Sequence, residues 1–237
     1  MPTIEWVGSP NFRAGRNGRR PLAIVDHITA GSYPGCLSWM QNPASQGSAH
    51  YLVLRDGRIL QLVKDEDTAW HAGIANKPNW SLYDGSNPNY YTLGIEHEGQ
   101  PGDELTGAQY QSTLWLHRQL LAKCPAITID DQNIIGHNRI DSVNRPNCPG
   151  PKFPWAKLFA DLKGGSELDN LVIYADGDTG AALILSQKLG CPMVHKGSAD
   201  KYQAAKKHWV GVQGTNDSGN VYYAGANRAE TAKKALE

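Results

Sequence analysis

Residues 21–31, PLAIVDHITAG, constrain the fold more than any other segment of the sequence. This apolar, β-branched run ends in turn residues, which is typical of a strand buried in a sheet. Residues 49–63 are predicted to form two strands around Asp56 and Gly57, a pair that favours a hairpin. Residues 91–99 give a further strand. The first part of the chain is therefore predicted to be organised around a sheet.

Two helices are predicted to follow these strands. Residues 105–124 have apolar residues at helical spacing, and Thr106 with Gln109 fits a capping box at the start of the helix. Residues 154–162, PWAKLFADL, are predicted to form a shorter helix.

A polar, Gly-containing segment, KGGSELDN at residues 163–170, separates the chain into two parts. We place the boundary near residue 166, which gives a first domain over residues 1–163, a linker over 164–169 and a second domain over 170–237. In the second domain strands are predicted at 171–175, 192–196, 209–213 and 221–225, and helices at 178–190, 199–208 and 227–237. This alternation favours a small α/β domain with a mainly parallel sheet.

Composition excludes several classes of protein. Lys plus Arg and Asp plus Glu both number 23, so electrostatics gives no reason to expect nucleic acid or an anionic membrane as a partner. Four cysteines are too few for a disulfide scaffold in a chain of this length. The first ten residues lack the pattern of a signal peptide, and no window approaches the roughly 20 apolar residues that span a bilayer. We expect a soluble protein made in the cytoplasm, without membrane insertion.

A His and a Cys lie around a polar, Pro-rich loop in residues 134–150, IIGHNRIDSVNRPNCPG. Zinc takes nitrogen and sulfur ligands, and a catalytic zinc keeps three protein ligands. His27, His137 and Cys148 would form such a set. A lone His on a strand such as that of His27 is more often a hydrogen-bonded core residue. A nucleophilic pair of Cys148 with His137 is the other enzymatic interpretation.

Glu96 lies on a strand among apolar residues. Gly94, Glu96 and Glu98 share one face of this strand, and a carboxylate there is costly unless it has a partner or a role. Glu96 is a candidate general base, or else a solvated carboxylate. A glycosidase pair is disfavoured, because Glu96 and Glu98 lie side by side and would not flank a sugar bond. Zinc chemistry gives a role to all four residues, whereas a Cys–His pair leaves His27 and Glu96 without one.

The segment TAWHAG, residues 68–73, contains Trp70 and His71 in a predicted loop. One interpretation is a packed Trp beside an incidental His. The other is the wall of a cleft that contacts a substrate.

Five motifs occur in a familiar order: AIVDHITAG, SAHYLVLRDGRILQLV, TAWHAG, LGIEHEG and IIGHNRIDSVNRPNCPG. In this order they resemble the zinc-dependent type-2 N-acetylmuramoyl-L-alanine amidases, a group that includes phage endolysins and relatives of peptidoglycan-recognition proteins. The resemblance extends over residues 1–160. It implies a mixed sheet flanked by helices in the first domain.

The resemblance also implies roles for individual residues. The family's zinc ligands fall on His27, His137 and Cys148, and its catalytic carboxylate falls on Glu96 rather than Glu98. Its position beside the active site falls on His71.

Two further family positions lie outside the ligand set. His50 matches a family His in the second strand and is expected to line the cleft or support the structure; with Trp70 and His71 we group it among the substrate contacts. Many members have a Lys two residues before the last ligand, where this chain has Pro146. In relatives this Lys helps to stabilise the oxyanion. Arg145 is next to the position, so it is grouped with the substrate contacts as the candidate substitute.

The second domain resembles the clostridial-type cell-wall-binding repeat, family 2. In that repeat a Gly-x-x-Arg-x-x-Thr segment opens the last helix, and here its residues are Gly225, Arg228 and Thr231. The resemblance implies binding to a cell-wall polymer and self-association of the domain. The alternative is a small α/β domain with a structural role.

Together the resemblances imply hydrolysis of the amide between N-acetylmuramic acid and L-alanine in peptidoglycan, with Zn²⁺ as cofactor. We expect an endolysin, made in the cytoplasm and released to the wall through a holin. Two alternatives stay open at this point: a non-catalytic peptidoglycan-binding protein, and a zinc hydrolase that acts on another amide.

Overall fold

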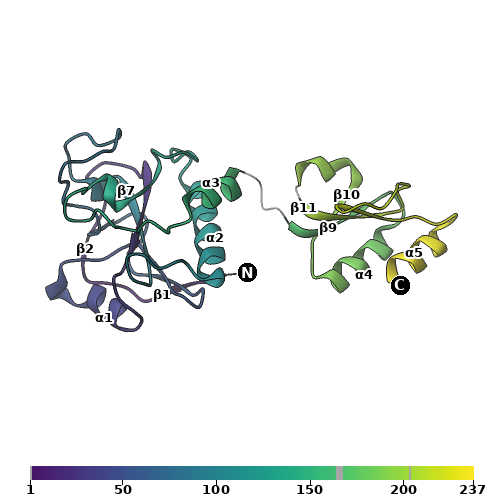
Figure 1. Cartoon of the computed structure of the whole chain (residues 1–237), viewed down its shortest axis with the longest axis horizontal. Helices are drawn as coiled ribbons and strands as arrows, with labels where there is room; N and C mark the ends of the chain where they lie inside the picture. Colours follow the sequence, from purple (N-terminus) through teal and green to yellow (C-terminus); the bar gives the residue numbers. More distant parts are fainter. Residues whose placement is uncertain (1, 164–167, 203) are drawn as a thin grey trace. The chain divides into compact units, whose positions relative to one another are not determined.

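The computed structural model describes residues 2–163, 168–202 and 204–237, and the chain divides after Leu162 into two compact units. Figure 1 shows the two units, and each is described by itself. Of the predicted linker, residues 164–167 lie outside the described residues, whereas residues 168 and 169 already belong to a strand. In the described part of the chain, no helix combines the length and the apolar character needed to cross a membrane.

A six-stranded sheet forms the centre of the first unit. Its strands, in spatial order, are β1 (Ile4–Trp6), β5 (Ile59–Gln61), β4 (Tyr51–Val53), β7 (Thr92–His97), β3 (Ala23–Ile28) and β8 (Ile134–Gly136). Only β4 and β5 are antiparallel, and the other pairs are parallel. The sheet is therefore mixed, as predicted.

The predicted hairpin is present between β4 and β5. The Gly57 backbone has a φ of 91°, a conformation that a side chain would strain, so the Asp-Gly pair specifies the turn. Strand β1 escaped prediction because it has three residues and gains its structure by pairing with β5. Smaller elements complete the unit: α1 (Gly35–Gln41), β2 (Phe12–Arg13) paired with β6 (Thr68–Ala69), and the 3-10 helices Pro43–Ser45, Pro88–Tyr90 and His137–Arg139.

Two predicted helices cover one face of this sheet. Helix α2 (Gly107–Lys123) opens with the predicted capping box. The Thr106 hydroxyl accepts the Gln109 N–H, and the Gln109 side-chain oxygen accepts the Thr106 N–H. Leu116 and Leu120 of α2 are fully buried in a cluster with sheet residues such as Ile24. Helix α3 (Trp155–Lys163) packs beside α2 (Figure 1).

The opposite face of β3 is directed toward the candidate residues. Ala23 and Val25 belong to a different cluster from Ile24, because successive side chains of a strand alternate between faces. By the same alternation, His27 shares the face of Ala23 and Val25, and Asp26 points toward α2. There the Asp26 carboxylate lies 3.2 Å from Nε2 of His117, a residue of α2.

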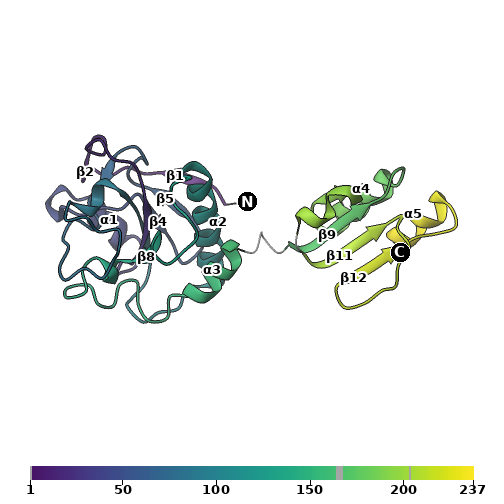
Figure 2. The same cartoon turned by 90° about the horizontal axis from the view of Figure 1, so that it is seen from above.

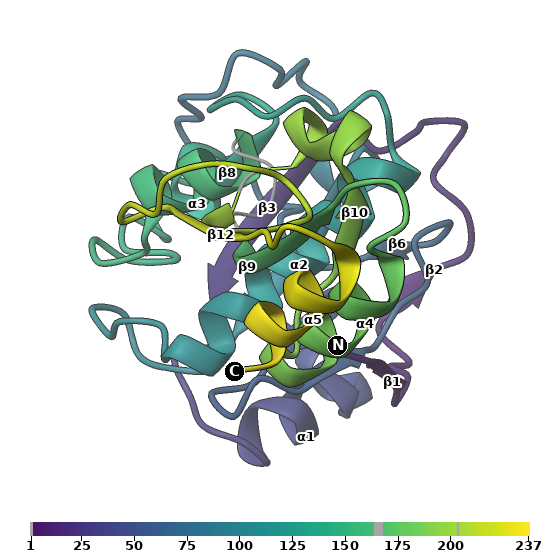
Figure 3. The same ribbon diagram turned by 90° about the vertical axis from the view of Figure 1, so that its right-hand side faces the viewer.

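The second unit is a four-stranded, entirely parallel sheet, as predicted. Its spatial order is β10 (Met193–His195), β9 (Leu168–Tyr174), β11 (Ala204–Val210) and β12 (Asn220–Tyr223); Figure 2 shows β9, β11 and β12 as adjacent arrows. Helices α4 (Thr179–Leu189) and α5 (Arg228–Leu236) pack side by side on one face (Figure 3).

The predicted helix over residues 199–208 is wrong. A 3-10 helix, Lys196–Lys201, is followed by β11, which lies between β9 and β12 in the sheet. His208 is buried in β11, where its ring nitrogens lie 3.1 Å from the Tyr223 hydroxyl and 2.8 Å from Oδ1 of Asn170. Pairing with two neighbouring strands thus overrides the helical propensity of an Ala- and Lys-rich segment.

The motif residues Gly225, Arg228 and Thr231 make contacts within this unit. The Thr231 hydroxyl accepts the Gly225 N–H at 2.9 Å, and a Cβ on Gly225 would overlap Glu230. The Arg228 guanidinium lies against Gly177, where a Cβ would collide with it. These contacts fix the start of α5 on the sheet.

Candidate metal centre

Parallel strands bring three predicted site residues to one edge of the first sheet. His27 near the end of β3 is the register partner of Glu96 on β7, and His137 directly follows β8. Because β3, β7 and β8 run parallel, their carboxyl ends meet at this edge.

Cys148 joins them because its loop folds back over the end of β8. The Asn138 N–H donates to the Cys148 carbonyl at 3.0 Å, and the Ile28 N–H lies 3.5 Å from the Cys148 sulfur. Gly136 leaves room for this return, since a Cβ there would collide with Pro149 and with Asn138.

His27, His137 and Cys148 together form a buried group that can hold a metal ion. Their potential ligand atoms all lie within 4.8 Å of one another. Nδ1 of His27 is 3.8 Å from the Cys148 sulfur, and the two imidazole rings have centroids 4.5 Å apart. Two nitrogens and one sulfur match the ligands that zinc prefers.

Burial controls the protonation of this group. It lowers the pKa of His137 to about 4 and that of His27 well below its usual value, and it raises the pKa of the Cys148 thiol to about 12. Both imidazoles are thus neutral at pH 7, as a metal ligand must be, whereas the thiol has to lose its proton when a metal binds. A raised thiol pKa opposes the alternative of a Cys nucleophile, which needs a thiolate.

Glu96 lies beside this group without a hydrogen-bond partner. Its Oε1 is 4.0 Å from Nδ1 of His27, and its buried Oε2 has no partner among the described residues. Burial raises the pKa of Glu96 to about 8, although the positive charge of Arg145 opposes the shift. A carboxyl group with such a pKa can take up and release a proton near neutral pH.

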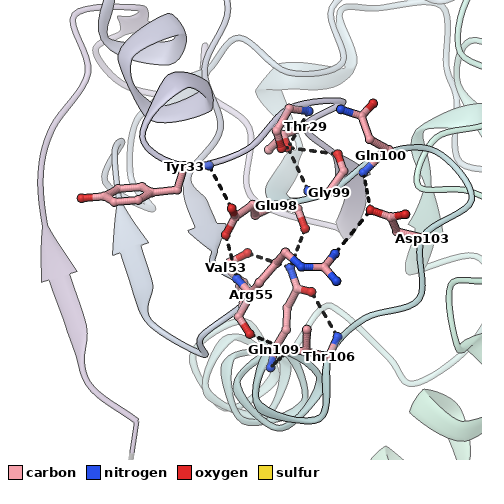
Figure 4. A network of polar contacts seen from close by, with 11 residues as sticks. Thr29, Tyr33, Val53, Arg55, Glu98, Gly99, Gln100, Asp103, Thr106 and Gln109 are labelled. Carbon is pink, nitrogen blue, oxygen red and sulfur yellow. Dashed lines mark hydrogen bonds and ion pairs between the residues drawn. The ribbon is translucent and has the colours of Figure 1, made fainter.

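Glu98, two residues further, is fully engaged (Figure 4). Its Oε1 accepts the Tyr33 N–H and its Oε2 accepts the Arg55 N–H, both at 2.9 Å. Its carbonyl also accepts Nε2 of Gln109 at 3.0 Å. Glu98 therefore ties together the backbone of two loops, and Glu96 is the carboxylate of this pair that is free for chemistry.

A cavity of about 1340 Å³ opens onto the cluster. His27, Glu96, His137 and Cys148 line it, together with two exposed tryptophans. Trp39 of α1 is 57% exposed and Trp70 is 36% exposed, so flat apolar surface is available beside the polar cluster.

Trp70, His71 and Arg145, which were predicted as substrate contacts, all line this cavity. The side chain of His71 is nevertheless turned toward His27, with its Nδ1 3.0 Å from Nε2 of His27. Arg145 is exposed. Its positive charge opposes the effect of burial on the pKa of Glu96 and adds to the effect of burial on the pKa of His137.

His50, the remaining predicted contact, lies away from the cavity, which corrects its grouping with the substrate contacts. It is completely buried, and its Nδ1 accepts the Gly94 N–H at 3.0 Å. Its Nε2 lies 2.8 Å from the Arg16 guanidinium and 3.2 Å from the Asp67 carbonyl. These contacts give His50 the structural role that was the other expectation for it.

The family model described as N-acetylmuramoyl-L-alanine amidase matches residues 17–151, more than half of the chain. The chain belongs to this amidase family. The matched residues include all three members of the metal-binding group and Glu96, and they end before the second unit.

Relatives of the chain include N-acetylmuramoyl-L-alanine amidase A of Achromobacter lyticus, 31% identical over 67% of this chain and 92% of that protein. The 1,6-anhydro-N-acetylmuramyl-L-alanine amidase AmpD of Escherichia coli is 40% identical over 47% of this chain. The latter match spans 56% of AmpD, so the chain covers about half the length of that relative.

Solved structures resemble the chain in fold. A selenomethionine derivative of AmpD has a TM-score of 0.55 at 30% identity, over 68% of this chain and 95% of that one. AmiD from Escherichia coli, in complex with anhydro-N-acetylmuramic acid-L-Ala-D-gamma-Glu-L-Lys, has a TM-score of 0.50 at 28% identity, over 69% and 62%. The endolysin amidase LysCS from Clostridium intestinale shares the fold at 22% identity, with a TM-score of 0.50 over 69% and 97%.

Sequence reasoning assigned no role to two residues beside the site, Thr92 and Gly94. The Thr92 hydroxyl contacts His71, and a Cβ on Gly94 would overlap the His71 ring. Both share the strand face of Glu96 by the alternation of β7, and this pattern in YTLGIEHEG could have identified them.

Proposed function

We propose that the protein hydrolyses the amide bond between N-acetylmuramic acid and L-alanine in peptidoglycan, with a zinc ion held by His27, His137 and Cys148 and with Glu96 as general base. The observation that carries the proposal is an unpartnered carboxyl group beside a buried N, N, S donor set in one cavity. The names of the relatives supply the substrate class.

The donor set fits zinc in kind and in number. Three protein ligands are typical of catalytic zinc, whereas structural zinc usually has four. When bound, zinc would polarise the amide carbonyl and make water a better nucleophile at neutral pH. The thiolate of Cys148 would add negative charge to the ligand set.

Glu96 moves the proton in this proposal. Its free carboxylate oxygen accepts a proton from the attacking water, and the protonated carboxyl then donates it to the departing amine nitrogen of L-alanine. The C–N bond breaks as the new C–O bond is completed, so N-acetylmuramic acid keeps a carboxylate and the peptide gains an amino group. A pKa of about 8 in the metal-free protein suits a group that both takes and returns a proton.

Arg145 supplies positive charge at the rim of the cavity. Its influence on the pKa of Glu96 and His137 supports a role in stabilising the oxyanion that develops on the amide carbonyl. Trp70 offers its exposed ring as a wall for the substrate.

The test is product analysis on purified bacterial cell walls. An amidase releases new amino groups without new reducing sugars. Reducing ends would indicate a glycosidase instead, and binding to walls without either product would indicate the alternative of a non-catalytic peptidoglycan-binding protein.

For the second unit we propose binding to a cell-wall polymer, with self-association of the unit as the means of raising its affinity. The resemblance of its sequence to a wall-binding repeat supports the proposal. The full chain should sediment with walls of a susceptible bacterium, whereas a chain ending at Lys163 should stay in the supernatant. Equal sedimentation of both chains would contradict it, and sedimentation velocity of the full chain tests self-association.

We also propose that the enzyme acts as an endolysin. Its production inside a susceptible bacterium should then cause lysis only when a holin is produced with it. Lysis at the same time without a holin would point to another route to the wall.

A further inference from the structure

We propose that His71 and Thr92 set the tautomer of His27, so that Nδ1 of His27 is left without a proton and faces the metal. This inference rests on the proposed function, because it assigns the ligand atom that His27 offers. It makes His71 a positioning residue for a metal ligand rather than a contact for the substrate.

Three hydrogen bonds link the metal ligand to a backbone carbonyl. Nε2 of His27 lies 3.0 Å from Nδ1 of His71, and Nε2 of His71 lies 3.1 Å from the Thr92 hydroxyl. The Thr92 hydroxyl in turn donates to the Pro88 carbonyl at 2.8 Å.

The positions of the protons follow from the end of this chain of bonds. A hydroxyl has one proton, and Thr92 gives it to the Pro88 carbonyl, so its oxygen accepts from His71. His71 therefore has its proton on Nε2. A neutral imidazole has only one, so Nδ1 of His71 accepts a bond from Nε2–H of His27.

Nδ1 of His27 is thereby left with a free lone pair. This is the atom that lies 3.8 Å from the Cys148 sulfur and 4.0 Å from Oε1 of Glu96. An outer partner that fixes the tautomer of a ligating His is a general feature of metal sites, although the usual partner is a carboxylate or a carbonyl. Here a second His and a hydroxyl extend the path to the carbonyl.

The opposite direction of donation along these hydrogen bonds is less favourable. If the Thr92 hydroxyl donated to His71, every proton would move to the other nitrogen, and His27 would have a proton on Nδ1, where it blocks the metal. In that arrangement the Thr92 bond to the Pro88 carbonyl is lost, whereas the first arrangement keeps all three bonds.

Two neighbours hold His71 in the position that this series of hydrogen bonds requires. Oδ1 of Asn89 accepts the N–H groups of His71 and Ala72 at 3.2 and 2.7 Å, which fixes the backbone. Gly94 provides the space for the ring, because a Cβ at this position would overlap it. One face of β7 thus supplies the hydroxyl of Thr92, the space at Gly94 and the carboxylate of Glu96.

The direct test is the tautomer of the metal-free protein, read from the ring nitrogen shifts of His27 and His71 by two-dimensional ¹⁵N NMR at pH 7. Both rings should have their proton on Nε2. A His27 ring with its proton on Nδ1 overturns the proposal, whether or not the protein turns out to be an amidase.

A matched pair of variants gives a second readout, the affinity for zinc alone in competition with a chelator. Thr92→Val keeps the shape but removes the acceptor, and should lower the affinity by about 10- to 100-fold. Thr92→Ser keeps the hydroxyl but loses the methyl group, and should stay within about 3-fold of the original chain. If packing alone mattered, Thr92→Val would have a higher affinity for zinc than Thr92→Ser, and that order overturns the proposal.

The two proposals fail in different ways. Loss of muramoyl-amide hydrolysis with the expected tautomers and zinc affinities would count against the proposed function only. Hydrolysis by the original chain, with unchanged zinc affinity in Thr92→Val, would count only against the proposal that His71 and Thr92 set the tautomer of His27. Should Thr92→Val fail to fold, the NMR result on the original chain decides.

Discussion

The two units place similar side chains at similar points of their sheets and differ in what surrounds them. In the first unit, Glu96 and His27 near the ends of β7 and β3 are largely withdrawn from solvent, with the carboxyl and imidazole atoms 4.0 Å apart. In the second, Asp176 and His195 follow or end β9 and β10 and form a pair at 2.8 Å. These two side chains are 81% and 41% exposed.

The pKa values express the difference. Burial raises the pKa of Glu96, whereas hydrogen bonding to His195 lowers the pKa of Asp176. Water solvates the charge of the second carboxylate, and the His195 ring lies within hydrogen-bond distance of it. A carboxylate and an imidazole at a strand end therefore indicate chemistry only where the fold removes water and leaves the carboxylate unpaired.

The largest effect is expected from Glu96→Gln, which removes the base from the buried edge. Hydrolysis of the muramoyl amide should fall by about 10²- to 10⁴-fold, because Gln cannot accept the proton. Zinc should stay bound, since Glu96 lies outside the ligand group. The measurement is the rate of amino-group release, with zinc content determined on the same sample.

The matched control for this variant is Glu98→Gln. It leaves one of two backbone N–H groups without its acceptor and should cost about 1 to 3 kcal/mol of stability, while the folded protein stays active. Equal loss of activity in the two variants would contradict the distinct roles of the two carboxylates.

A smaller effect is expected on the stability of the metal-free protein as the pH changes. Between pH 4.5 and about 8 the unfolded chain has an ionised Glu96, whereas the folded chain retains the proton. The folded state binds more protons in this window, so its stability falls as the pH rises. At pH 8, the free energy of unfolding of Glu96→Gln should be larger than that of the original chain by an amount on the order of 4 kcal/mol.

Denaturant unfolding at pH 4.5 and pH 8, with a chelator present, measures this difference. The two chains should be closely similar at the lower pH. A gap that is the same at both values would show that the raised pKa of Glu96 is absent from the folded protein.

The smallest effect is expected from Asp176→Asn in the second unit. Its contact with His195 is exposed, and exposed polar or charged pairs contribute little to stability. The melting temperature and the rate of amide hydrolysis should both match those of the original chain. A clear loss of hydrolysis would mean that the exposed edge takes part in the chemistry after all.

Local patterns predicted much of this structure. The Asp56-Gly57 turn and the Thr106–Gln109 capping box were readable because each depends on residues close in sequence. The alternation of side chains also placed Glu96 on one strand face with Gly94 and Glu98. Residue type and spacing offered His27, His137 and Cys148 as a zinc set, and the family resemblance assigned them as ligands. The order of β7, β3 and β8 that brings them together could not be predicted from local patterns.

What escaped prediction depends on distant partners. Residues 199–208 have the composition of a helix, but strands on both sides make the end of this segment part of β11. His50 resembles a cleft residue in sequence, yet its buried ring contacts the Arg16 guanidinium and the Gly94 N–H in the interior. The alternation of β7 puts Thr92 on the face of Glu96, but its contact with His71 joins a strand to a loop, and no local pattern reveals that contact.

The most direct test of the account is zinc content measured beside amide hydrolysis, in the original chain and in His137→Ala and Cys148→Ala. The account predicts about one zinc per chain, with both zinc and hydrolysis lost in each variant. Protein that is free of metal and still hydrolyses the amide would contradict the metal centre and return a Cys–His mechanism to consideration. Zinc retained without hydrolysis of any wall would contradict the proposed activity and point to a binding protein.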